Sequence, residues 1–224
     1  AALRLARAIR DRRSRRRRAA RRGAALDMAR VLRRSLARGG DPVALARKRR
    51  PERPMRLVVL CDVSGSMEVH ARVFLAFVRG LVSADARAQA FLFHTRLVAI
   101  TAALAERDPF RAATRLSLMA EGFGGGTDIG GCLTRFCEHH AARAVNGRTV
   151  VVILSDGYCS GAPEAVGGAL ARLGRRAGRI VWLSPLDADP APAAIEAARP
   201  RLDALLFATT IDALGALEAE FARL

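Results

Sequence analysis

The chain has 224 residues, of which 51% are hydrophobic and 5% aromatic, and its formal net charge is +17. This length and apolar content are sufficient for one large α/β domain with a core built mainly from aliphatic side chains. No apolar stretch reaches the roughly 18 residues that a membrane span requires, which argues against an integral membrane protein. The sequence contains four cysteines and lacks a secretory signal, so we expect reduced thiols in the cytoplasm.

The positive charge is concentrated in the first quarter of the chain. Residues 1–56 contain 21 basic and 4 acidic side chains, whereas residues 57–224 contain 17 of each. Every basic residue except Lys48 is an arginine. We therefore expect two physically different segments, a basic helical arm with its linker over residues 1–55 and an α/β domain over residues 56–224.

The basic segment contains two candidate helices. Residues 3–22 are compatible with a helix, but their arginines repel one another. Residues 25–38 are predicted to form an amphipathic helix that ends at Gly39-Gly40, and its apolar side chains are Leu26, Met28, Ala29, Leu32 and Leu36. Residues 41–54 are predicted to be a turn and a basic linker. No aromatic residues are interleaved with the arginines for base stacking, so an acidic protein partner or a tether is favoured over nucleic acid.

The remaining sequence alternates between apolar strands and helices. Strands are predicted at 56–62, 88–94, 96–101, 149–155, 179–184 and 203–208, and helices at 69–84, 108–119, 128–144, 162–176, 191–198 and 211–222. The connection at His94-Thr95 is too short for a crossover helix, so the second and third strands should form an antiparallel hairpin. This alternation predicts a doubly wound, mostly parallel six-stranded sheet with one antiparallel edge strand, similar to a Rossmann fold.

Three loops with oxygen-bearing side chains follow strands or precede a helix of this predicted sheet. They contribute the candidate site residues Asp62, Ser64, Ser66, Thr127 and Asp156. Ligands of open parallel sheets bind beyond the carboxyl ends of the strands, where these loops should meet. Carboxylates and hydroxyls suit Mg²⁺, with Mn²⁺ and Ca²⁺ as alternatives, and suit zinc poorly. Neutral hydroxyl ligands leave much of the ion's charge unquenched, so a protein partner's carboxylate is the expected outside ligand.

The two serines and several neighbouring residues also have simpler structural interpretations. Ser64 or Ser66 alone could cap the helix at 69–84, and Asp128 is expected to cap the helix that follows it. Gly125 and Gly126 either give the loop flexibility or permit a close backbone approach. Glu68 either tunes the site or is an ordinary first-turn glutamate. These four residues, Gly125, Gly126, Asp128 and Glu68, are candidates for supporting the metal or contacting the partner.

A second set of possible metal ligands is less convincing. It consists of Cys132, Cys137, His139 and His140. The two cysteines lie five residues apart on a predicted helix and therefore do not share one stripe, which disfavours zinc. No phosphate-binding loop and no G-x-S-x-G nucleophile motif is present, so we expect a protein that is not an enzyme.

The three loops together resemble the metal-ion-dependent adhesion site (MIDAS) of von Willebrand factor type A domains. The matching stretches are "DVSGS" for Asp62, Ser64 and Ser66, "GGGTD" for Thr127, and "LSDG" for Asp156. The resemblance implies that the two serines and the threonine bind the metal, whereas the two aspartates act largely through water molecules.

Longer stretches look like the CoxE-like branch of this family. They are "LDMARVLRRSLARGG", "LVVLCDVSGSM", "GGGTDIGGCL", "VVILSDG" and "VWLSPL". This resemblance implies a cytoplasmic, metal-dependent adaptor that works with a MoxR-type AAA+ ATPase to mature a client metalloenzyme of the carbon monoxide dehydrogenase type. The alternative is a basic nucleic-acid-binding protein that uses its arginine-rich arm.

Overall fold

The computed structural model describes residues 17–36, 39, 45–49, 55–106, 111, 126–186 and 190–208. The chain divides into two compact units, and the boundary between them lies at Pro54 and Met55. The larger unit, from Met55 onward, contains the six-stranded sheet, and the smaller unit falls within residues 10–54.

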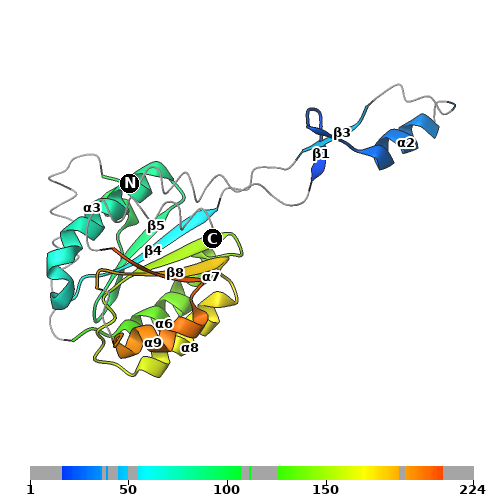
Figure 1. Ribbon diagram of the computed structural model, residues 1–224. Coiled ribbons are helices and arrows are strands. Elements are labelled where there is room, and N and C mark those ends of the chain that lie inside the picture. The colour runs from blue at the N-terminus through cyan, green and yellow to red at the C-terminus, as the bar shows by residue number, and fades with distance from the viewer. Residues whose placement is uncertain are drawn as a thin grey trace. The chain divides into compact units, whose positions relative to one another are not determined.

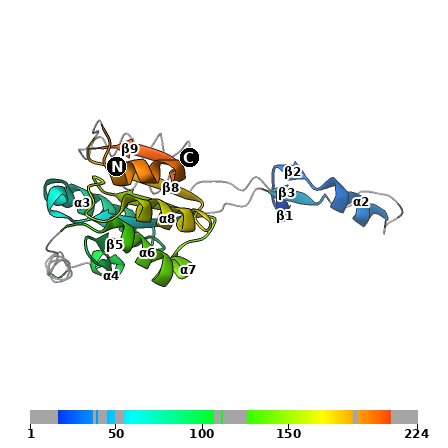
Figure 2. The same cartoon turned by 90° about the horizontal axis from the view of Figure 1, so that it is seen from below.

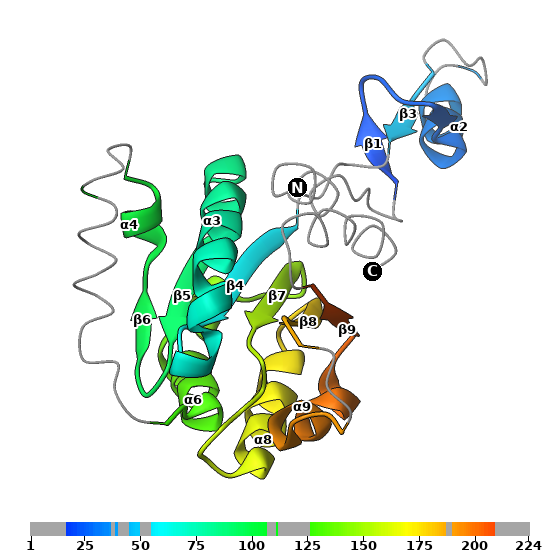
Figure 3. The ribbon, with the colours of Figure 1, turned by 60° about the vertical axis from the view of Figure 1, so that its left-hand side comes forward.

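The larger unit is built on a sheet with the strand order β6-β5-β4-β7-β8-β9 (Figure 3). Its strands are β4 (Arg56–Asp62), β5 (Gln89–Phe93), β6 (Leu97–Ala99), β7 (Thr149–Leu154), β8 (Arg179–Ser184) and β9 (Ala204–Phe207). All neighbouring strands are parallel except β5 and β6, which form the antiparallel hairpin at one edge. The predicted fold class and the antiparallel edge strand are therefore confirmed.

The central strands are apolar throughout because both of their faces are covered. Alternate residues of β4 enter two different clusters of buried side chains, with Val59 and Cys61 in one and Val58 and Leu60 in the other. All six residues of β7 are buried. Near-continuous apolar runs are typical of parallel strands between two helical layers, and such a core leaves only the strand ends for polar groups.

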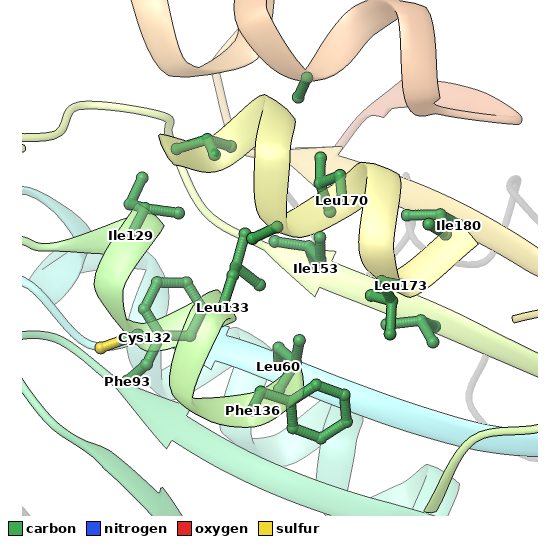
Figure 4. Packing of buried hydrophobic residues seen from close by; sticks show 14 of the residues in the cluster. Leu60, Phe93, Ile129, Cys132, Leu133, Phe136, Ile153, Leu170, Leu173 and Ile180 are labelled. Atoms are coloured by element: carbon green, nitrogen blue, oxygen red, sulfur yellow. The ribbon is translucent and has the colours of Figure 1, made fainter. Parts of the chain in front are cut away.

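The helices cover the two faces of this sheet unequally (Figure 1). Helix α3 (Glu68–Ala84) and the short α4 (Thr101–Leu104) cover one face. The other face is covered by α6 (Ile129–His139), α7 (Ala141–Ala144), α8 (Pro163–Gly174) and α9 (Ala193–Ala198). Figure 4 shows side chains of α6 and α8, among them Phe136 and Leu170, packed over strand residues such as Ile153. Two 3₁₀ turns, η1 (Gly65–Met67) and η2 (Arg199–Arg201), complete the unit.

Three of the six predicted helices are confirmed, one is divided in two, and two lie outside the described residues. The helix expected at 128–144 is divided at His140 into α6 and α7, and α4 was not predicted. The helices expected at 108–119 and 211–222 lie outside the described residues, with the exception of Arg111. The helices expected near 69–84, 162–176 and 191–198 are confirmed as α3, α8 and α9.

The smaller unit contains a short antiparallel sheet in addition to the expected helix (Figure 2). Its elements are β1 (Arg18–Ala20), β2 (Ala25–Leu26), β3 (Arg47–Arg49) and helix α2 (Met28–Leu36), and β3 lies between β1 and β2. The helix interpretation of residues 3–22 is wrong for Arg18–Ala20, because these residues pair with β3 about thirty positions further along the chain. Such long-range pairing overrides a local helix preference.

Within the part of the chain that the structure describes, no helix is both long enough and apolar enough to cross a membrane.

Truncating the centre of the sheet should destabilise the larger unit strongly. Ile153 is 0% exposed in β7, so Ile153→Ala should lower the free energy of unfolding by about 2–5 kcal/mol through lost burial and a residual cavity. The buried Trp182, the single tryptophan of the chain, provides a fluorescence signal for urea unfolding of this unit. Leu186→Ala, at a side chain that is 37% exposed, is the control and should cost under about 1 kcal/mol. Equal losses in the two variants would contradict this description of the core.

Candidate metal centre

Asp62 is the last residue of β4, and its side chain is completely buried. One carboxylate oxygen, Oδ1, accepts a hydrogen bond of 2.9 Å from the backbone N–H of Ser64. The other, Oδ2, accepts a hydrogen bond of 2.7 Å from the hydroxyl of Ser155. The carboxylate is therefore held in one orientation at the carboxyl end of the strand.

The two serines of the first loop place their hydroxyls next to each other. The Oγ atoms of Ser64 and Ser66 lie 3.1 Å apart, with Ser64 buried and Ser66 exposed. The capping interpretation fails for both serines, because the N-cap residue of α3 is Met67 and no side chain caps this helix. The two hydroxyls are therefore not engaged by the helix end, and they form an adjacent pair of neutral oxygen donors.

Asp156 follows β7, the strand that runs parallel to β4 with Leu154 beside Cys61. Its carboxylate is 1% exposed, and Oδ1 accepts a hydrogen bond of 3.1 Å from the backbone N–H of Tyr158. The second oxygen, Oδ2, is buried and has no hydrogen-bond partner. A buried carboxylate oxygen without a partner is costly, and a cation that binds there would remove this cost.

Backbone hydrogen bonds link Thr127 and the next residue, Asp128, to two neighbouring loops. The N–H of the next residue, Asp128, donates to the carbonyl of His94 over 3.0 Å, and His94 follows the strand that pairs with Asp62. The carbonyl of Thr127 accepts two bonds of 2.9 Å from Ser160, one from its N–H and one from its hydroxyl. The buried Thr127 is thus linked both to the end of β5 and to the loop that contains Asp156.

Two glycines permit the close approaches in these loops. A Cβ at Gly126 would lie 2.5 Å from the Oγ of Ser160, so a larger residue would displace the serine that holds the carbonyl of Thr127. Gly157, next to Asp156, has φ +83° and would place a Cβ 2.5 Å from Ile195. A non-glycine residue there would be both strained and sterically blocked. At position 126, by contrast, the close neighbour that requires glycine is the side chain of Ser160.

The electrostatic environment of Asp62 disfavours its charge when no cation is present. The pKa of its carboxyl is raised to about 6, because burial and, to a smaller extent, the negative charge of Asp156 outweigh the hydrogen bonds from Ser155 and Ser64, which lower it. No salt bridge among the described residues involves either carboxylate. Two buried carboxylates close enough to repel each other are an arrangement that a divalent cation stabilises.

The remaining candidate residues have different positions. Asp128 caps α6, since its Oδ1 accepts a hydrogen bond of 2.8 Å from the N–H of Gly131, which confirms the capping expectation. Glu68 is the first residue of α3, but its side chain lies outside the description, as does Gly125.

Ser155 is a residue of the site that the sequence analysis did not single out. Its hydroxyl donates to Asp62 and accepts a hydrogen bond of 3.1 Å from the N–H of Gly157, so it links the loops of β4 and β7. Its carbonyl accepts from the indole N–H of Trp182 over 2.9 Å. The available signal in the sequence was a hydroxyl between a fully apolar strand and the candidate aspartate.

The structure gives no support to the zinc interpretation of the cysteines. The Sγ of Cys132 donates to the carbonyl of His94, and the Sγ of Cys137 donates to the carbonyl of Ala169, both over 3.5 Å. Burial raises the pKa of Cys132 to about 11, which keeps it a neutral thiol. No group of three His, Cys, Asp or Glu side chains among the described residues is placed to hold a metal.

The raised pKa of Asp62 predicts an unusual pH dependence for the metal-free protein. Because the folded state retains the proton up to about pH 6 and the unfolded state only to about 3.8, the stability that this group contributes is present at low pH. It should be lost as pH rises from about 4 to about 6, by an amount on the order of 3 kcal/mol.

Urea unfolding in the presence of a chelator, compared between the wild type and Asp62→Asn, isolates this effect. The difference in the free energy of unfolding, wild type minus variant, should fall between pH 4 and pH 6.5. A difference that is constant or that rises over this range would contradict the environment described for Asp62.

No curated protein matches the chain. Proximal thread matrix protein 1 from the mussel byssus is similar with a TM-score of 0.51 and 16% identity, over 75% of this chain and 46% of that one. A von Willebrand factor type A protein from Catenulispora acidiphila has a TM-score of 0.49 and 16% identity, over 79% and 43%. The mussel protein with a zinc-occupied MIDAS motif has a TM-score of 0.49 and 16% identity, over 75% and 47%.

The chain spans somewhat less than half the length of these three proteins, and at such identities the similarity concerns the fold alone. The sequence also matches the model of a protein family over residues 1–214, which is most of the chain. The chain therefore belongs to the family of von Willebrand A (VWA) domain containing CoxE-like proteins.

Proposed function

We propose that this protein is a cytoplasmic, non-enzymatic adaptor that binds a protein partner through a divalent metal ion at the carboxyl ends of β4 and β7. The observation that carries the proposal is the buried Oδ2 of Asp156, which has no hydrogen-bond partner and lies near the equally buried Asp62. A cation at this point would compensate both carboxylates, which otherwise destabilise the fold.

The donors available at this edge favour a hard cation. Ser64, Ser66 and Thr127 would supply hydroxyl oxygens, while Asp62 and Asp156 would hold water molecules and balance the charge. All of these are oxygen donors, a set that suits Mg²⁺ and, as alternatives, Mn²⁺ or Ca²⁺. When bound, such an ion supplies a positive charge with a coordination position open to an outside carboxylate. Ser155 positions Asp62 through its hydrogen bond, so the carboxylate of Asp62 is already oriented before a partner binds.

Exposed apolar side chains along the same edge of the sheet support the proposal that the partner is a protein. Phe207 is the last residue of β9, and Tyr158 and Leu186 lie in the segments that follow β7 and β8. They are 41%, 53% and 37% exposed, respectively. Because the carboxyl ends of parallel strands share one edge, these side chains flank the candidate metal centre. A partner segment that offers both a carboxylate and apolar contacts fits this edge.

Membership of the CoxE-like family supports a more specific role. We propose that the partner is a MoxR-type AAA+ ATPase, and that the pair acts on a client metalloenzyme of the carbon monoxide dehydrogenase type during its maturation. In this arrangement the VWA domain supplies recognition, and the ATPase supplies the energy of nucleotide hydrolysis.

Metal binding should stabilise the folded protein. Mg²⁺ should raise the thermal unfolding midpoint of the wild type, because binding to the folded state alone adds its free energy to the stability. Asp62→Ala and Asp156→Ala should remain folded and lose the Mg²⁺-dependent increase. Asp85→Asn, at a turn aspartate paired with Arg87, is the matched control and should keep the increase. A wild-type midpoint that does not respond to Mg²⁺, Mn²⁺ or Ca²⁺, or an increase retained by Asp62→Ala, would refute metal binding at this site.

Partner binding should depend on the same site. A purified MoxR-type ATPase should bind the wild type in Mg²⁺ and bind at least about tenfold more weakly in EDTA or to Asp62→Ala, since one metal–carboxylate contact is lost. Biolayer interferometry with the intact chain measures this ratio. Binding that is equally tight in EDTA would separate the two claims, because the metal could then be present without bridging the partner.

A further inference from the structure

The smaller unit contains a concave site that is lined by four arginines. This hollow has a volume of about 420 Å³, and its charged side chains are Arg21, Arg30, Arg34 and Arg47. We call it the arginine hollow. The other described residues of its wall are three alanines and one leucine. Its volume lies in the range of about 300–1,000 Å³ that is typical of sites for small molecules.

Three segments of the unit bring these arginines together (Figure 2). Arg21 directly follows β1, and Arg47 is the first residue of β3, the strand that pairs with β1. Arg30 and Arg34 lie four residues apart on α2 and therefore share one flank of the helix. The hollow is thus formed by tertiary structure, because no single segment of the sequence supplies all four guanidinium groups.

Hydrogen bonds hold the walls of the hollow in place. The N–H of Asp27 donates to the carbonyl of Ala46 over 2.8 Å, which fixes the beginning of α2 beside β3. The guanidinium of Arg47 donates from Nη1 to the carbonyl of Gly23 over 3.1 Å, which orients this side chain. A Cβ at Gly23 would overlap the carbonyl of Lys48, so the turn requires glycine at this position. The site is therefore largely formed before a ligand binds.

The positive charge of the hollow has no counterpart in the described part of this unit. Asp27 is the single acidic residue described there, and its carboxylate accepts a hydrogen bond of 3.4 Å from the backbone N–H of Arg30. No salt bridge among the described residues involves any of the four arginines. All four are exposed, so a ligand can reach them. Several guanidinium groups around one hollow produce a positive potential that concentrates anions.

The ligand that fits this site carries several negative charges within a small volume. A guanidinium group binds the oxygens of a carboxylate or a phosphate through paired hydrogen bonds. A single carboxylate carries one charge and leaves most of the four groups without a partner. A peptide would have to order several acidic side chains inside the hollow, and each of them would lose rotamer freedom. A chain of phosphate groups presents comparable charge on neighbouring atoms without that loss.

We propose that the arginine hollow is a binding site for a compact oligophosphate, either an inorganic one or the phosphate chain of a nucleotide. A duplex nucleic acid or an anionic membrane presents its phosphates on an extended surface, which meets the rim of a hollow and not its inside. A second copy of this chain would bring arginines against arginines. A short chain of phosphates matches both the charge and the size of the site.

Isothermal titration calorimetry on the full chain, in EDTA and about 0.15 M salt, tests this proposal. At this ionic strength, attraction beyond about 8 Å is largely screened, so diffuse association with the other arginines is suppressed. Sodium tripolyphosphate should bind at one site, and orthophosphate should bind at least about tenfold more weakly, because one phosphate cannot reach all four guanidinium groups. ATP distinguishes the two sources of the ligand. An affinity equal to that of tripolyphosphate shows that the phosphate chain alone is recognised, and an affinity at least about tenfold higher identifies a nucleotide.

Matched variants locate the site. Arg30→Ala with Arg34→Ala should weaken tripolyphosphate binding at least about tenfold, because two of the guanidinium groups of the hollow are removed. Arg18→Ala with Arg33→Ala removes the same charge from exposed residues of this unit outside the wall, and should change the affinity less than about threefold. Both variants should retain the circular dichroism spectrum of the wild type. Asp62→Ala should bind tripolyphosphate as the wild type does, which separates this test from the fate of the metal centre.

Four results would overturn the proposal. The first is a wild type that does not bind tripolyphosphate, and the second is orthophosphate that binds as tightly as tripolyphosphate. Equal losses in the two double-arginine variants would assign the binding to the net charge of the unit. A hexaglutamate peptide, a short duplex DNA or phosphatidylglycerol vesicles could also bind more tightly than tripolyphosphate, in a way that Arg30→Ala with Arg34→Ala abolishes. That result would assign the hollow to an acidic protein, a nucleic acid or a membrane.

Discussion

The constraint on which the site depends is the parallel pairing of β4 with β7, which carries two carboxylates to one buried edge. Asp62 is the last residue of β4 and Asp156 lies just after β7, and the register of the two strands places Cys61 beside Leu154. Both side chains are almost inaccessible to solvent, and the charge of one disfavours ionisation of the other. A fold that buries two like charges without an ion pair is stabilised by an external cation, and the neighbouring hydroxyls supply the neutral ligands that such a cation requires.

Much of this architecture could be predicted from the sequence because the physical signals are local. Each strand of the large sheet is an apolar run bounded by polar residues, and the short turn at His94 required a hairpin. The site residues could be proposed because they follow strands that a parallel sheet gathers at one edge. The roles of Ser155 and Ser160 could not be predicted, since they depend on contacts between loops that lie 93 and 33 residues apart in the sequence.

The smaller unit marks the limit of pattern-based prediction. Its strands are only two or three residues long and contain mainly basic or small side chains, so no alternation of apolar and polar residues predicts them. The amphipathic period of α2 was evident, but a period identifies a face without identifying what covers it. Burial of Val31 and Ser35 instead of Leu32 and Leu36 shows how the tertiary environment chooses between adjacent lines of one helix. The two units thus differ in chemistry, because the larger one places oxygen donors at one edge of its sheet and the smaller one exposes apolar and arginine side chains.

The most direct test of the central claim is anomalous X-ray diffraction from crystals of the full chain grown with Mn²⁺. The account predicts one strong anomalous peak at the carboxyl ends of β4 and β7, in direct contact with the hydroxyls of Ser64, Ser66 and Thr127. Asp156 should then reach this ion through an ordered water molecule. A peak elsewhere on the protein, or well-ordered loops with no peak between Asp62 and Asp156, would contradict it.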